Sequence, residues 1–137
     1  MGNRSAISEM KEMANYLSSR IIGAAIEVHR MLGPGLLESA YEECTCHELS
    51  LQGDVLLERQ VPLPIMYKGV KLDCGYRLDL VVGKLVIVEF KAVEKIEPIH
   101  EAQLLTYLRL SNLWLGLIIN FNVPVLKDGL KRIVHGE

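Results

Sequence analysis

Residues 85–121 predict a helix between two apolar strands, and this pattern limits the folds open to the chain. The first strand is LVIVEF, residues 85–90, and the second is LWLGLIINF, residues 113–121. The intervening helix covers residues 98–110, where Pro98 suits the first turn. A strand–helix–strand crossover beside antiparallel hairpins implies a mixed sheet flanked by helices.

The remaining segments add helices before this unit and strands on either side of it. Two stretches have apolar residues at helical spacing, and strand-like segments are separated by the turn pairs KG and GK. Two prolines make the first strand an edge or bent strand. The predicted order is α-α-β-β-β-α-β(-β), an α/β (α+β) fold with a central mixed sheet of four to five strands. These segments are helices at 8–32 and 36–53 and strands at 54–67, 70–82 and 128–135.

Length and composition suit one domain over residues 1–137, in which we expect residues 1–7 to be a disordered tail. Hydrophobic residues make up 50%, and no apolar run approaches the ~20 residues of a membrane helix. Three cysteines without framework spacing fit a reducing compartment, so we expect a cytoplasmic protein with no membrane partner. The net charge of −2 counts against a high-affinity, non-specific nucleic-acid binder but permits an acidic metal site.

Ionisable side chains lie at the ends of two neighbouring apolar strands. Glu89 and Lys91 share one face of their strand, because positions two apart lie on the same side. Arg77 and Asp79 share a face of the preceding strand in the same way. Asp79 and Glu89 lie opposite each other if the loop is centred on Lys84, whereas a one-residue slip puts them on opposite faces. In the first register, two carboxylates and one ammonium converge at one edge of the sheet.

This combination of charges fits phosphodiester hydrolysis. Two neighbouring carboxylates repel each other unless a cation lies between them, and Mg²⁺ accepts one or two carboxylates, waters and phosphate oxygens as ligands. Lys91 would position or activate a metal-bound water and stabilise charge on phosphorus. Arg77 is the best local candidate for a phosphate contact, with an ion pair to Asp79 or Glu89 as its alternative. The structural alternative for Asp79, Glu89 and Lys91 is a Glu89–Lys91 ion pair on a solvated strand end, with Asp79 as a surface residue.

Three short motifs carry a resemblance to a known family. LD at 78–79 followed by EFK at 89–91 resembles the D…(D/E)xK signature of the PD-(D/E)xK nuclease superfamily, with leucine in place of proline. QLLTY, residues 103–107, resembles the QxxxY motif of its RecB-type branch. GLLESAY, residues 35–41, matches the signature that names the GxxExxY family of the same superfamily. The resemblance covers nearly the whole chain.

The resemblance implies a restriction-endonuclease-like core and a Mg²⁺-dependent nuclease, in which Mn²⁺ would substitute for Mg²⁺. Asp79 and Glu89 would bind the metal with help from Glu38, and Lys91 would act as the catalytic lysine. The partner would be nucleic acid, with DNA favoured over RNA. The residues that would orient substrate or support the site are Gln103 and Tyr107.

A second hypothesis is a non-catalytic interaction domain that retains the nuclease fold and binds nucleic acid or protein. The near-minimal length and the mild negative charge favour it, whereas the intact acid–acid–lysine set counts against it. Oligomeric state is open, although an apolar edge such as LWLGLII would permit a homodimer.

Several other residues have structural interpretations that compete with functional ones. The helix dipole stabilises the negative charge of Glu38 whether or not Glu38 has a role in the site. Tyr41 is expected to be an aromatic residue of the core. We expect His29 to be structural and His100 to be solvated, although His100 lies one turn before Gln103. The CTCH cluster, residues 44–47, predicts buried or half-buried thiols rather than a zinc site, because Cys46 points away from its neighbours' face.

Overall fold

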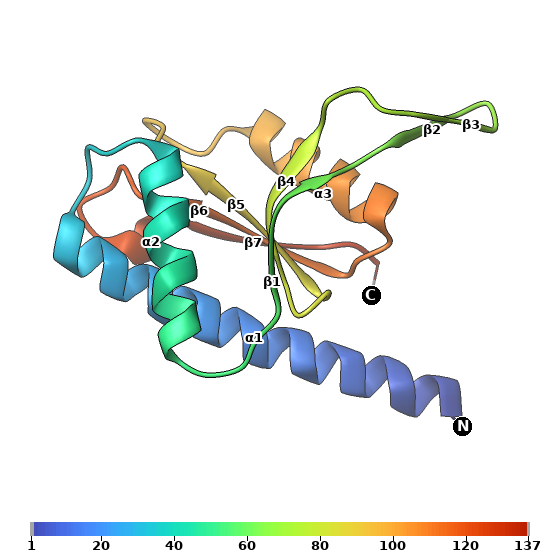
Figure 1. Cartoon of the computed structure of the whole chain (residues 1–137), viewed down its shortest axis with the longest axis horizontal. Helices are drawn as coiled ribbons and strands as arrows, with labels where there is room; N and C mark the ends of the chain where they lie inside the picture. The colour runs from blue at the N-terminus through green and yellow to red at the C-terminus, as the bar shows by residue number, and fades with distance from the viewer. Residues whose placement is uncertain (1, 137) are drawn as a thin grey trace.

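A twisted sheet with helices on both sides forms the molecule (Figure 1). The structure is a computed structural model that describes residues 2–136. Helices α1 and α2 cover one face of the sheet, and α3 covers the other. In chain order the elements are α1 (Gly2–Leu32), α2 (Glu38–Leu51), β1 (Leu57–Pro62), β2 (Ile65–Tyr67), β3 (Val70–Leu72), β4 (Arg77–Val82), β5 (Val86–Lys91), α3 (Pro98–Ser111), β6 (Leu115–Asn120), the 3₁₀ helix η1 (Leu126–Gly129) and β7 (Leu130–Val134). Within residues 2–136, no helix combines the length and apolar character that crossing a membrane requires.

The predicted mixed sheet is confirmed and has five strands, in the order β1-β4-β5-β6-β7. The crossover through α3 makes β5 and β6 parallel, with Val86 opposite Leu115. The other neighbouring strands of this sheet are antiparallel. The short last strand expected from the sequence is β7, which pairs with β6.

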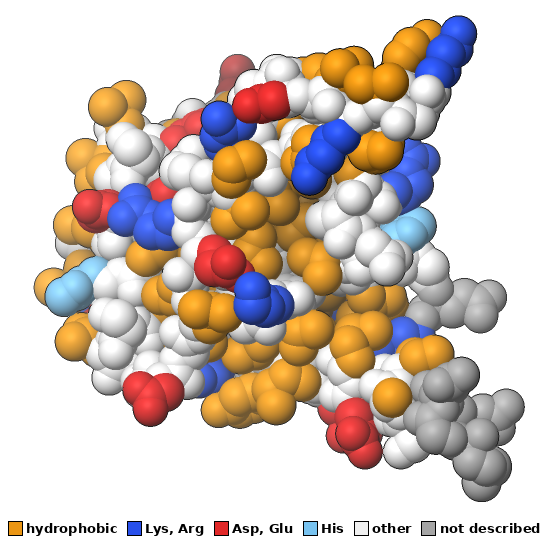
Figure 2. Space-filling view, turned by 45° about the vertical axis from the view of Figure 1, so that its right-hand side comes forward, with side chains coloured by type: hydrophobic (Ala, Val, Ile, Leu, Met, Phe, Trp, Pro, Cys, Tyr) orange, Lys and Arg blue, Asp and Glu red, His pale blue; other side chains and the backbone are white. Residues whose placement is uncertain are grey.

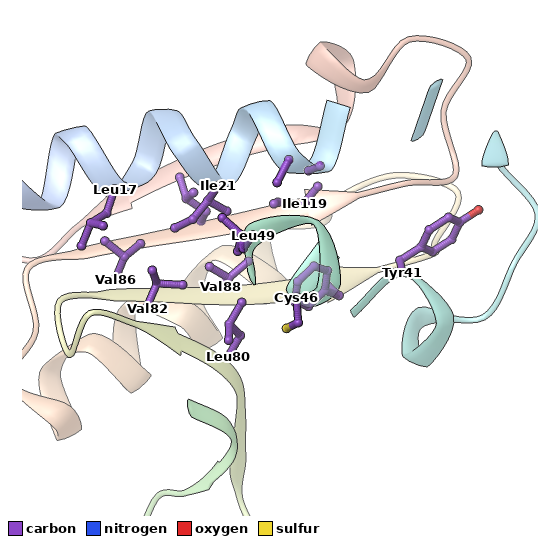
Figure 3. Packing of buried hydrophobic residues seen from close by; sticks show 14 of the residues in the cluster. Leu17, Ile21, Tyr41, Cys46, Leu49, Leu80, Val82, Val86, Val88 and Ile119 are labelled. Atoms are coloured by element: carbon purple, nitrogen blue, oxygen red, sulfur yellow. The ribbon is translucent and has the colours of Figure 1, made fainter. Parts of the chain in front are cut away.

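Two apolar clusters fix the direction in which each residue of β5 points. Val88 and Phe90 pack toward α1 and α2, in the cluster that includes Ile21 (Figure 3). Ile87 is fully buried on the opposite face, beneath α3. Burying a side chain of this size is worth about 1.5–3 kcal/mol, so the alternation resists a register slip. Glu89, two positions after Ile87, therefore belongs to the α3 side of the sheet.

The first helix is longer than the sequence suggested. α1 begins at Gly2 rather than at Ser8, so residues 2–7, expected as a disordered tail, are helical in the structure. These residues contain no proline to stop a helix that continues into a packed segment. Ser5 Oγ also donates a hydrogen bond to Glu9 Oε1 (3.4 Å), one turn further on.

The segment expected as one strand over residues 54–67 is divided in two. β1 ends at Pro62 and β2 begins at Ile65, because Pro62 and Pro64 have no N–H with which to continue a ladder. β2 and β3 form a separate two-stranded hairpin that projects from the body (Figure 1). The three consecutive strands expected before α3 are corrected accordingly: β1, β4 and β5 are neighbours in the sheet, and the β2–β3 hairpin is inserted between β1 and β4.

Candidate active site

The turn between β4 and β5 sets the register on which the site depends. Gly83 and Lys84 both have positive φ (60° and 58°), the conformation that a tight hairpin turn requires. The paired residues on the two strands are centred on Lys84. Continuing this register beyond the last pair places Asp79 opposite Glu89, which is the arrangement that the sequence required for a shared site.

Asp79 and Glu89 are joined by two hydrogen bonds between side chain and backbone. The N–H of Asp79 donates to Oε2 of Glu89 (2.9 Å), and the N–H of Phe90 donates to Oδ2 of Asp79 (2.9 Å). The bonds lie just beyond the last pair of the β4–β5 ladder, so each strand fixes the carboxylate of the other. Oδ1 of Asp79 and Oε1 of Glu89 accept no hydrogen bond from the described residues, and neither is a fully buried atom. One oxygen of each carboxylate is therefore available to a ligand.

The environment makes it difficult to ionise both carboxyl groups at once. Glu89 is only 7% exposed, and burial together with the negative charge of Asp79 raises the pKa of Glu89 to about 8. Burial also raises the pKa of Asp79, while the hydrogen bond from Phe90 acts to lower it. A cation beside both carboxylates would reverse these shifts, because it favours the ionised form of each.

The donors present fit a hard divalent cation. Mg²⁺ binds oxygen ligands and in proteins keeps several waters alongside one or two carboxylates. The two available oxygens of Asp79 and Glu89 match that requirement. Within the described chain, no group of three or more His, Cys, Asp or Glu side chains is arranged to hold a metal ion. Waters and substrate would therefore have to supply the remaining ligands.

Lys91 ends β5 beside the carboxylates. It forms no ion pair with any residue of the described range, so the expected alternative, a Glu89–Lys91 ion pair, is not present. Its positive charge still acts to lower the pKa of both Asp79 and Glu89, which places the ammonium within electrostatic reach of them. The N–H of Phe121 donates to the carbonyl of Lys91 (3.0 Å) and fixes its backbone.

The GLLESAY segment brings a third carboxylate to the end of β5. Gly35 has φ of +108°, which favours glycine, and α2 begins three residues later at Glu38. Oε2 of Glu38 accepts a hydrogen bond from the N–H of Ala92 (3.1 Å), the residue after Lys91. Glu38 thus holds the backbone that follows Lys91, and it is not grouped with the two central carboxylates into a three-ligand cluster.

Tyr41 closes the loop that leads into α2. Its ring is fully buried and stacks on Phe121 (centroids 4.2 Å apart). Its hydroxyl donates to the carbonyl of Gly33 (2.6 Å) and accepts from the N–H of Leu36 (3.1 Å). The interpretation of Tyr41 as a core aromatic is confirmed, and the hydroxyl additionally fixes the path of the chain toward Glu38.

Glu42 is a buried acid near the site that the sequence analysis did not single out. It is 6% exposed and accepts hydrogen bonds from Arg59 Nε (3.0 Å) and Gln60 Nε2 (2.9 Å). Its charge contributes to the raised pKa of both Asp79 and Glu89. The available signal was its position one turn after Glu38, which places the two acids on the same face of α2.

Tyr107 and Gln103 lie on α3, which covers the face of the sheet that also carries Glu89. Tyr107 is 7% exposed, and burial followed by the charge of Glu89 raises the pKa of its hydroxyl. The Tyr107 ring also meets the edge of Tyr76 (centroids 6.0 Å apart). Both Gln103 and Tyr107 line a cavity of about 310 Å³. Tyr107 therefore lies within electrostatic reach of Glu89, and Gln103 shares the cavity with it.

In the described part of the chain, Arg77 does not form the ion pair with Asp79 or Glu89 that was the alternative to a phosphate contact. The side chain is exposed, its Nη1 donates to the carbonyl of Tyr76 (2.9 Å), and it lies 3.7 Å from Oδ1 of Asp73. Arg77 therefore remains at the rim of the site.

Both histidines singled out in the sequence have structural partners. His29 is buried, with Nε2 2.8 Å from the carbonyl of Val123, as expected of a structural residue. His100 accepts a hydrogen bond from the N–H of Glu97 (2.9 Å) in a capping box at the start of α3, rather than being simply solvated. Cys46 of the CTCH cluster is buried, and burial raises the pKa of its thiol to about 11.

A mixed five-stranded sheet with two carboxylates and a lysine at the end of its central hairpin defines a restriction-endonuclease-like fold. Residues 15–133 match the family model of the PD-(D/E)XK nuclease superfamily, and the chain belongs to this superfamily. Comparison with curated proteins and with solved structures gave no match.

Proposed function

We propose that this protein is a metal-dependent nuclease that hydrolyses phosphodiester bonds of DNA or RNA, with DNA as the favoured substrate. The observation that carries the proposal is the pair of bonds between Asp79 and Glu89, which leaves one oxygen of each carboxylate available beside the unpaired ammonium of Lys91. A binding module has no need for a buried and a half-buried acid that resist joint ionisation. A hydrolase needs them to hold a cation at the scissile phosphate.

In this proposal Asp79 and Glu89 would hold Mg²⁺, or Mn²⁺ in its place, with the carboxylate oxygens that accept no hydrogen bond from the described residues. The ion, when bound, lowers the pKa of water and withdraws negative charge from the phosphate. The ammonium of Lys91 donates a hydrogen bond to the attacking water or to a phosphate oxygen, where negative charge develops. Glu38 holds the backbone after Lys91 through Ala92 and so keeps the lysine in place.

The remaining site residues act on the substrate. Tyr107 and Gln103 line the same cavity on the α3 side of the sheet and would contact the nucleotide next to the scissile bond. Arg77, exposed at the rim, would contact a phosphate further along the strand. Tyr107 is buried, and the charge of Glu89 acts to raise the pKa of its hydroxyl, so this hydroxyl rather than the Gln103 amide is the donor that senses the acids.

We also assign the chain to the GxxExxY group, and its α3 motif to the RecB-like QxxxY branch. Each residue of GxxExxY has a separate task in the fold: Gly35 supplies a positive φ, Glu38 binds the N–H of Ala92, and Tyr41 closes the loop. We place the protein in the cytoplasm, because a buried and an exposed free thiol suit a reducing compartment.

A cleavage assay tests the proposed function. End-labelled single- and double-stranded DNA and RNA are incubated with the protein in Mg²⁺, Mn²⁺ or EDTA. Wild type is expected to cut at least one substrate only when a divalent ion is present, and Asp79→Asn to lower the rate by about a hundredfold or more. Asp54→Asn, at an exposed position outside the site, is the matched control and keeps the wild-type rate. Absence of cleavage in every condition would leave the interaction-domain hypothesis in its place.

A further inference from the structure

The β2–β3 hairpin has two chemically different faces. Opposed residues of an antiparallel pair share a face of the ribbon. On the first face the opposed pairs are Ile65 with Leu72 and Tyr67 with Val70. The second face carries Met66 opposite Lys71. One side of the ribbon is therefore wholly apolar, and the other carries a charge.

The apolar face is open to solvent for most of its length. Tyr67 is 59% exposed, and Val70 and Leu72 are also exposed. A two-stranded ribbon is marginally stable by itself, and contiguous exposed apolar surface on a soluble protein marks an interaction site. The hairpin stands away from the sheet, so no other element of the fold covers its outer part (Figure 1).

The charge of the hairpin favours an anionic partner. Residues 63–72 contain Lys68 and Lys71 and no Asp or Glu, although the whole chain has a net charge of −2. Neither lysine forms an ion pair with a residue that the structure describes. Lys68 lies in the turn, with Nζ 5.5 Å from the centre of the Tyr67 ring. Figure 2 shows hydrophobic side chains along the projecting arm and basic atoms at its tip.

The apolar face of the hairpin also continues into the cavity beside Tyr107. Ile65, at the base of the hairpin, lines the cavity of about 310 Å³ together with Tyr76 and Tyr107. The rings of Tyr76 and Tyr107 are in edge contact, and Tyr107 responds to the charges of the two site acids. A strand held along the hairpin would therefore pass the cavity that Tyr107 lines, and Tyr107 is the residue on which the charges of both acids act.

We propose that the apolar face of the β2–β3 hairpin binds single-stranded nucleic acid, with a base against Tyr67 and its phosphate at Lys68. The inference rests on the proposed function and deepens it, because it names the form of substrate and the element that holds it. An exposed aromatic ring beside an unpaired ammonium is how proteins hold single strands, since every base offers a flat face and every nucleotide a phosphate. In a duplex the base faces are stacked inside, so Tyr67 has nothing to contact.

Fluorescence anisotropy with labelled oligonucleotides in EDTA tests the inference, because EDTA prevents metal-dependent cleavage during the measurement. The test variants are Tyr67→Ala and Lys68→Gln, and the matched controls are Met66→Ala on the opposite face of the hairpin and Lys84→Gln in the β4–β5 turn. Met66 is as exposed as Tyr67, at 61%. Tyr67→Ala is expected to weaken binding of a single strand about tenfold, and Lys68→Gln about threefold. The controls stay within about twofold of wild type, and a duplex of the same length binds more weakly than the single strand.

Three results would overturn the inference. The first is that Tyr67→Ala binds the single strand as tightly as wild type, or that wild type does not bind it at all. The second is that Met66→Ala loses as much affinity as Tyr67→Ala. The third is a duplex that binds as tightly as the single strand. A related outcome is that wild type elutes in size-exclusion chromatography as a dimer, which Tyr67→Ala converts to a monomer. If the affinity for the oligonucleotide is then unchanged, the first result holds and the face binds a second copy of the chain.

Cleavage of the same oligonucleotides in Mg²⁺ reports on the proposed function separately. Binding that depends on Tyr67 without any cleavage contradicts the nuclease but supports the hairpin as the binding element. Cleavage that is indifferent to Tyr67 supports the nuclease and contradicts the hairpin assignment.

Discussion

Asp79 donates its backbone N–H to Glu89, and its carboxylate accepts the next N–H beyond Glu89 in return. In both bonds the side chain is the acceptor, through a single oxygen. The amide oxygen of Asn or Gln can accept the same bond. Removing the charge of either residue therefore keeps this contact between β4 and β5, so amide variants separate the electrostatics of the site from the integrity of the fold.

The first prediction concerns pH. The pKa of Glu89 is about 8 in the folded chain, against an ordinary value of 4.5. The folded state thus holds a proton that the unfolded state releases, and the stability this provides is complete below pH 4.5 and is lost as the pH rises to about 8. In EDTA we expect the free energy of unfolding to fall by on the order of 1–3 kcal/mol between about pH 5 and 8. Denaturant titration at several pH values measures it, and Glu89→Gln should flatten the slope. Identical slopes for the two proteins would contradict the prediction.

The second prediction follows from the same proton. At pH 7, below the pKa of about 8, Glu89 is mostly protonated without metal, whereas a bound ion requires the ionised form. Binding of Mg²⁺ should therefore release close to one proton at about pH 7 and almost none at about pH 9. Calorimetric titrations in two buffers with different ionisation enthalpies count this proton. A count that does not change with pH would mean that the ion binds elsewhere.

The third prediction concerns the loop after Lys91, which Asn120 fixes. The buried Asn120 side chain accepts from the N–H of Val93 (3.0 Å) and donates to the carbonyl of Val93 (2.9 Å). Asn120→Ala leaves those backbone groups without these partners and should cost about 1–3 kcal/mol of unfolding free energy. The exposed Asn122, whose Nδ2 donates to the same Val93 carbonyl at the longer distance of 3.4 Å, is the matched control, and Asn122→Ala should cost no more than about 0.5 kcal/mol. Thermal and denaturant unfolding compare the two, and equal losses would show that Asn120 has no special role.

The register of the site could be read from the sequence because a turn and an apolar alternation specify it together. Gly83 and Lys84 mark the turn, and the burial of Ile87 fixes which face Glu89 takes. Strand periodicity says which residues face each other, and it predicted Asp79 opposite Glu89 on condition of an odd loop. It says nothing about which atom accepts which hydrogen bond, so the reciprocal bonding could not be foreseen.

Other features depend on contacts between residues that are distant in the chain. The binding of Glu38 to Ala92, 54 residues away, and the pairing of Glu42 with Arg59 require the relative placement of α2 and the sheet. The helical spacing of the two acids was visible in the sequence. The sequence did not show which part of the sheet that face of α2 would contact. The β2–β3 hairpin was missed as a separate element because its alternation continues that of β1, and only the prolines indicated the break.

The central claim is that Lys91 acts with the two carboxylates on a phosphodiester bond. It is tested most directly by single-turnover cleavage of a labelled oligonucleotide at saturating Mg²⁺, comparing Lys91→Gln with Lys84→Gln. Lys84 is an exposed turn lysine whose nearest acid is Glu58 at 3.6 Å, so its loss controls for the general effect of one positive charge. We expect Lys91→Gln to lower the rate about a hundredfold or more with unchanged unfolding temperature, and Lys84→Gln to cleave at the wild-type rate. A Lys91→Gln protein that cleaves as fast as wild type would contradict the account.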